Sequence, residues 1–154
     1  MVEGVAEFRR RMRSVAQKVR EPLRAELEKI AADIVRQMRS VVARQSGALA
    51  ASIDYTFDKP PKGSIRIATV GGGKDSLIVT IYAGGKTAAG DAFYARFVEF
   101  GTKPHTIPVP GSDGPGVRHP GAAAQPFFFP VFRANKKNVR ARIRIVLRRA
   151  IRGV

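Results

Sequence analysis

The chain has 154 residues, which is enough for one hydrophobic core and too few for two ordinary domains, so we expect a single domain over residues 1–154. Hydrophobic residues make up 44% and charged residues 26%, a balance typical of globular chains, and the absence of cysteine excludes disulfides and thiolate metal sites. Twenty-eight Lys and Arg against 12 Asp and Glu give a net charge of +16, and no segment has the apolar length of a signal peptide or a membrane span, so we expect neither export nor membrane insertion.

The first 45 residues predict helix. Apolar residues recur at steps of three and four on either side of Pro22, and proline is tolerated in the first turn of a helix but not inside one. We therefore expect a long N-terminal helix or a kinked helix pair restarting near Pro22 and ending at Ser46 and Gly47. The two apolar stripes are Val5, Phe8, Met12, Val15 and Val19, then Leu23, Leu27, Ile30, Ile34, Met38 and Val41.

Residues 50–103 predict a small antiparallel sheet of three to five strands, because the apolar period changes to two. Turn-forming runs at 59–63 and 71–75 separate the strands and favour a meander. Residues 104–126 are rich in proline and glycine and predict an exposed loop or a short extra hairpin. The alternating residues are Ile53, Tyr55 and Phe57, then Ile65 and Ile67, then Leu77, Val79 and Ile81.

Residues 127–154 predict an amphipathic, strongly basic helix. Together the elements predict an α+β fold in which this C-terminal helix packs on the sheet. The apolar face carries Phe132, Val139, Ile143, Val146 and Ala150.

The last acidic residue is Asp113, and ten cations follow it without a carboxylate. Such a segment repels itself unless a polyanion or an acidic surface lies nearby. Three interpretations stay open: contact with duplex DNA, contact with an acidic protein, or a solvated face. The candidate contact residues are Arg133, Lys137, Arg140, Arg144, Arg148, Arg149 and Arg152.

No grouping predicts catalysis, a cofactor or a metal. Gly73-Lys74-Asp75 lacks the earlier glycine and the Ser or Thr that a phosphate-binding loop needs. Gly85-Lys86-Thr87 lacks the earlier glycine and the helix that should follow. His105 and His119 are the only histidines, with Asp113 the only carboxylate between them, and a metal would need further ligands. We therefore expect a protein that is not an enzyme.

Three short segments resemble one known family. Ser46 to Ile53, Tyr94 to Thr102 and Gln125 to Phe132 resemble, in this order, segments of the tail-component family of long-tailed bacteriophages, described as tail completion or head-tail joining proteins. The resemblance extends over roughly 46–152, with N-terminal helices similar in length and character. Relatives often carry Leu-Arg-Pro where this chain has Phe128, Phe129 and Pro130, a substitution that removes a cation.

This resemblance implies a structural virion protein of the neck or upper tail, assembled in the host cytoplasm. It implies a ring, as a hexamer, around packaged double-stranded DNA, with a tail terminator, a head-closure protein or a tail-tube protein as neighbours. The alternative function is a non-catalytic protein that binds double-stranded DNA without sequence preference. Three consecutive phenylalanines cannot all face one core, so the aromatic segments predict core or subunit-interface positions at Tyr94, Phe97, Glu99, Phe100, Gly101, Pro126, Phe127, Phe128 and Phe129.

Overall fold

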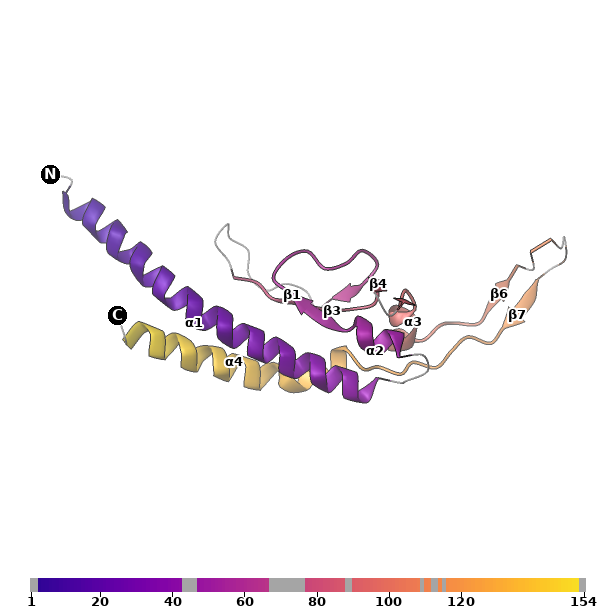
Figure 1. The fold of residues 1–154 in the computed structure, drawn as a ribbon. Coiled ribbons are helices and arrows are strands. Elements are labelled where there is room, and N and C mark those ends of the chain that lie inside the picture. Colours follow the sequence, from indigo (N-terminus) through magenta and orange to yellow (C-terminus); the bar gives the residue numbers. More distant parts are fainter. Residues whose placement is uncertain are drawn as a thin grey trace.

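The chain folds into an elongated α+β structure, known here from a computed structural model that describes residues 3–42, 47–66, 77–87, 90–108, 110–111, 114 and 116–152. Two long helices lie side by side, a small sheet covers one side of them, and a hairpin projects from the far end (Figure 1). The predicted α+β class is confirmed. The elements are α1 (Glu3–Val41), α2 (Ala48–Ser52), β1 (Asp54–Thr56), β2 (Ile65–Arg66), β3 (Thr80–Ala83), β4 (Lys86–Thr87), β5 (Gly90–Asp91), α3 (Ala95–Phe100), β6 (His105–Ile107), β7 (Val117–His119) and α4 (Phe129–Arg152).

Helix α1 runs through Pro22 without interruption, so the long-helix alternative is correct and the restart is not observed (Figure 1). In its second apolar stripe Ile30, Ile34 and Met38 are buried in the core as predicted, while Leu23 and Leu27 are half-buried. Val41 is 58% exposed, whereas Val42 is buried, because the buried face continues from Met38 by a step of four. In the first stripe only Val19 has a described side chain, and it is half-buried; the side chains of Val5, Phe8, Met12 and Val15 lie outside the described residues.

The main sheet has three antiparallel strands in the order β1-β3-β2. Tyr82 of β3 pairs with Asp54 on one side and Arg66 on the other. The predicted meander order is therefore wrong, since β3 and not β2 lies in the middle. The reason is burial: three of the four β3 residues are buried, and a strand in that position satisfies its backbone groups on both edges. Ile67 lies outside the described residues.

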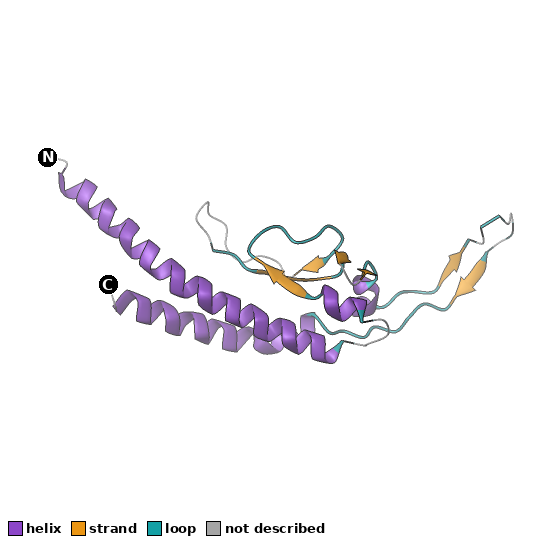
Figure 2. Cartoon of the chain, viewed as in Figure 1, coloured by secondary structure: helices purple, strands orange, loops and turns teal. Residues whose placement is uncertain are grey.

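Two small hairpins complete the β-structure. Strands β4 and β5 pair, which places Gly85-Lys86-Thr87 at a hairpin and not before a helix, while Gly73-Lys74-Asp75 lies outside the described residues. Strands β6 and β7 pair as well, so the predicted extra hairpin in the Pro/Gly-rich stretch is confirmed. This β6–β7 hairpin extends away from the helices and the main sheet (Figure 2).

Helix α4 runs back along α1 in the opposite direction and shares its core (Figures 1 and 2). Phe132, Val139 and Ile143 are half-buried against this core, as their spacing predicted. Over the described ranges, no helix has a run long and apolar enough to cross a bilayer. The core itself lies between α1, the sheet and the start of α4, and includes Ile30, Ile34, Met38, Leu49, Ile53, Ile81, Phe127 and Phe128.

Candidate partner-binding surfaces

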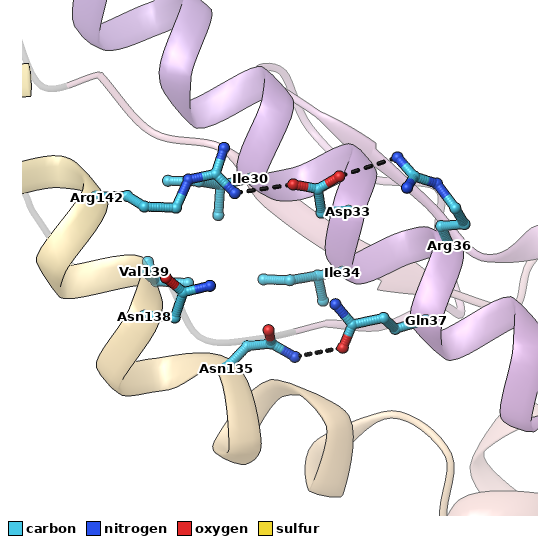
Figure 3. A pocket seen from close by; sticks show the side chains of 9 residues that line it. All are labelled: Ile30, Asp33, Ile34, Arg36, Gln37, Asn135, Asn138, Val139 and Arg142. Atoms are coloured by element: carbon cyan, nitrogen blue, oxygen red, sulfur yellow. Dashed lines mark hydrogen bonds and ion pairs between the residues drawn. The ribbon is translucent and has the colours of Figure 1, made fainter.

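One arginine of α4 is turned inward and fastens the helix to α1. Arg142 donates hydrogen bonds through Nε to Glu26 at 2.6 Å and through Nη1 to Asp33 at 2.8 Å (Figure 3 shows the pair with Asp33). The hydrogen bond from Arg142 holds the pKa of Asp33 below its ordinary value, and the same hydrogen bond raises the pKa of Arg142. Next to it, Asn135 donates to the side-chain oxygen of Gln37 at 2.7 Å.

These ion pairs of Arg142 were not predicted from the sequence, although the sequence carries a signal for them. Glu26 and Asp33 are seven residues apart, which places both carboxylates on one face of α1. Arg133, Lys137 and Arg140 share one face of a helix with 3.6 residues per turn. By the same repeat, Arg142 lies on the opposite face. An arginine displaced from the others, opposite two aligned acids, is the pattern of an internal ion pair.

The seven candidate contact residues of α4 are all exposed. Five of them, Arg133, Lys137, Arg140, Arg144 and Arg148, follow steps of three and four and form one stripe along the helix. We call these five residues the basic stripe. Among the described residues, Arg142 is the one α4 cation with a carboxylate within ion-pair distance. The basic stripe therefore faces solvent with its charge uncompensated by the described part of the chain.

The two aromatic segments meet at Glu99. This residue is 3% exposed, and its carboxylate accepts hydrogen bonds from the backbone N–H groups of Phe127 and Phe128 at 2.8 and 2.9 Å through Oε2, and of Phe129 at 3.0 Å through Oε1. These donors lie at the N-terminus of α4, where N–H groups lack partners within the helix. Negative charge is also favourable there because of the helix dipole. Glu99 thus caps α4 from α3.

The other predicted aromatic positions divide between interior and surface. Phe127 and Phe128 are buried, while Tyr94 and Phe129 are half-buried against the core. Phe97 and Phe100 are exposed on α3, and Pro126 is exposed before α4. Helix α3 therefore contacts the start of α4 through Glu99 and also presents two phenylalanines to solvent.

Gly101 ends α3 in a conformation that other residues rarely adopt. Its φ is +70°, and a Cβ at this position would lie 2.7 Å from the Ala122 carbonyl oxygen. Directly after it, Thr102 and Ala122 exchange backbone hydrogen bonds at 2.9 and 3.2 Å. The glycine allows the two chain segments that lead to and from the β6–β7 hairpin to approach each other closely.

The segment from Ser46 to Ile53 connects α1 to the sheet through α2, a helix too short for the sequence pattern to predict. Leu49 and Ile53 are buried in the core. The buried Ser52 hydroxyl donates to the Leu49 carbonyl at 2.7 Å and accepts the N–H of Gly84 at 3.0 Å. Ser52 thereby joins α2 to the end of β3. Ser46 lies outside the described residues.

The two histidines face each other across the β6–β7 hairpin, with ring centroids 5.1 Å apart. His119 Nδ1 accepts a hydrogen bond from the N–H of Gly121 at 3.0 Å, so its proton is carried by Nε2. His105 Nδ1 lies 2.9 Å from the Lys103 carbonyl oxygen, to which it can donate. A metal bound at His119 Nε2 would require the ring proton to move to Nδ1. There the proton would point at the N–H of Gly121, so two hydrogen-bond donors would face each other. Asp113 lies outside the described residues.

Comparison with known proteins identifies a family. No curated protein and no solved structure matches the chain. A family model described as "Bacteriophage HK97-gp10, putative tail-component" matches residues 6–101, from the first turns of α1 to the end of α3. The match includes α1 from residue 6 onward, the segment Ser46 to Ile53, and the segment from Tyr94 as far as Gly101, while Gln125 to Phe132 lies beyond it. The chain belongs to the HK97-gp10-like tail-component family of bacteriophages, and is a structural component of the phage tail.

Proposed function

We propose that this tail component acts where the tail is completed and joined to the head, as a subunit of a ring around the DNA path. The basic stripe of α4 carries the proposal, since it provides a row of exposed cations without carboxylates among the described residues. A passage for a genome is the place in a virion where such a row is useful. The proposal also includes a hexameric ring, a position in the neck of the virion, and the absence of catalytic activity.

The dimensions of the basic stripe suit a duplex. Arg133 and Arg148 are 15 residues apart, or about 22 Å of helix at 1.5 Å per residue. One strand of a duplex presents a phosphate about every 3.4 Å of axis, so the stripe passes about six phosphates. Six copies of a +16 chain would carry about 96 excess positive charges, a strong field for a narrow passage.

Binding to duplex DNA tests the role of the stripe. If five cations each neutralise one phosphate, the slope of log affinity against log salt is about −4.5, and affinity falls about 500-fold between 50 and 200 mM salt. Arg140→Gln with Arg144→Gln should reduce the slope to about −2.7. The matched control changes two exposed cations outside α4, Lys59→Gln with Arg66→Gln, and should leave the slope nearly unchanged. Equal effects of both double variants would contradict a contact through the stripe.

Electron microscopy of phage lacking the gene tests the neck position. We expect DNA-filled heads beside unjoined tails of normal length, because joining would fail after both parts are complete. Infectious particles of normal appearance would refute the proposal, and overlong tails would identify a tail terminator instead.

The second candidate function is a protein that coats duplex DNA without sequence preference, and the same basic stripe favours it. This function requires tight DNA binding by a monomer or dimer and no defect in particle joining. An acidic neighbouring protein as the partner of the stripe would give weak DNA binding together with the joining defect.

A further inference from the structure

An open groove of about 860 Å³ lies where the β6–β7 hairpin leaves α3. We call it the aromatic groove. Phe97 and Phe100 are 49% and 58% exposed there. Contiguous exposed apolar side chains are a feature of surfaces that bind partners. The groove is lined by Arg96, Phe97, Phe100, Lys103, His105 and His119, among other residues.

The orientation of α3 fixes this aromatic surface. Phe97 and Phe100 are three residues apart and share one side of the helix. The carboxylate of Glu99, on a different side of α3, is held by three backbone N–H groups at the start of α4. The ring of Phe100 also lies 5.7 Å from that of Phe129. The bonds of Glu99 thus fix the orientation of α3, and with it the side on which Phe97 and Phe100 are exposed.

The charge of the groove is of one sign. Arg96 and Lys103 are exposed and line it, and no carboxylate lines the groove within the described ranges. The two histidine rings add polar surface at the base of the hairpin. A lining that combines phenylalanines with cations is complementary to a segment that carries both apolar side chains and carboxylates.

A second copy of this chain fits the groove poorly. Every copy carries 28 Lys and Arg against 12 Asp and Glu, so its surface is short of the carboxylates that Arg96 and Lys103 would pair with. Several of its 12 acidic residues are already engaged inside the molecule: Glu26 and Asp33 by Arg142, and Glu99 by α4. A different protein, with a local excess of carboxylates, matches the charge.

We propose that the aromatic groove docks an acidic, aromatic-containing segment of another virion protein. An apolar side chain of that segment packs on Phe97 and Phe100, and flanking carboxylates pair with Arg96 and Lys103. This inference rests on the proposed role in particle joining, for which it supplies the chemistry of one partner, and it leaves the basic stripe of α4 free for DNA.

The test uses the full chain and a fluorescent synthetic peptide that alternates aspartate with leucine and phenylalanine. A second peptide, with asparagine in place of every aspartate, is the matched probe for charge. In a fluorescence anisotropy titration we expect the acidic peptide to bind at least about tenfold more tightly than its amide counterpart, and Phe97→Ser to weaken it by a similar factor. Phe93→Ser is the control, because Phe93 is 65% exposed but does not line the groove.

Three results would overturn the assignment. The first is no binding of the acidic peptide below about 1 mM. The second is binding that is lost in Arg140→Gln with Arg144→Gln but kept in Phe97→Ser, which would place the peptide on the basic stripe. The third is loss of self-association in Phe97→Ser by light scattering, which would make a second copy the occupant. Each concerns the isolated chain, so the phenotype of phage lacking the gene remains a separate test of the proposed function.

Discussion

Replacing Glu99 should destabilise the protein more than replacing any exposed carboxylate, because one buried side chain holds the start of α4. Its two oxygens accept three backbone hydrogen bonds of 2.8, 2.9 and 3.0 Å. A hydrogen bond to a charged group stabilises by about 1.5–3 kcal/mol, but three that share one carboxylate are not additive. We expect Glu99→Ala to lower the free energy of unfolding by about 3 kcal/mol, more than the roughly 1 kcal/mol of an ordinary exposed cap.

Urea denaturation followed by circular dichroism measures this change. Glu99→Gln keeps one acceptor oxygen and loses the charge, so it should cost about half as much as the alanine variant. Glu28→Ala is the matched control: Glu28 is exposed, its contact with the Tyr55 hydroxyl is 3.4 Å long, and the expected change is within about 0.5 kcal/mol. If Glu99→Ala changed stability no more than Glu28→Ala at an equal denaturant slope, the cap would have no energetic role and the reasoning would be refuted.

Three further predictions concern stability. Arg142→Gln should destabilise the protein at neutral pH. Because Arg142 lowers the pKa of Asp33 in the folded protein, its ion pair stabilises the fold above the unfolded pKa of about 3.9, and this contribution is lost as Asp33 becomes protonated. In urea titrations the difference in stability between variant and wild type should therefore shrink as pH falls below about 4. A difference that stayed constant down to pH 2 would contradict the ion pair. Gly101→Ala should cost at least about 1 kcal/mol by thermal unfolding, since alanine is strained at a φ of +70° and has no room; an unchanged melting temperature would exclude that strain. Ser52→Ala should cost about 1–3 kcal/mol because it leaves a buried N–H without its acceptor, whereas Ser40→Ala, at an exposed hydroxyl, should cost little; equal costs would contradict a special role for Ser52.

Long amphipathic elements could be predicted from the sequence because their periodicity extends over many turns. The stripe through Ile30, Ile34 and Met38 and the half-buried face of α4 lie where their spacing places them. Helices α2 and α3 have five and six residues, less than two turns, so no period could establish them. Alternation likewise identifies strands but not their order, which is why β3 was not expected at the centre.

The capping of α4 by Glu99 could not be predicted either, and the reason is different. The sequence showed two aromatic segments as candidates for core or interface, but the contact between them joins a side chain to backbone N–H groups 28 to 30 residues away. Every residue except proline carries such a donor, so the sequence holds no sign of which ones a glutamate will meet. The seven exposed cations of α4 could be located by spacing alone, whereas the inward turn of Arg142 depends on acids of α1.

The residues that maintain the fold and the residues proposed to contact a partner lie in different parts of the chain. The family match ends at Gly101. Within it lie residues that make internal contacts or allow a tight turn: Leu49, Ser52, Glu99 and Gly101. The basic stripe lies beyond the match, on an exposed face whose cations can be replaced without disturbing the core. Glu99→Ala should therefore weaken the fold and every function with it, while Arg140→Gln with Arg144→Gln should keep the stability of wild type and weaken only contacts that depend on charge. A joining defect in that double variant at normal stability would trace the defect to this face of α4.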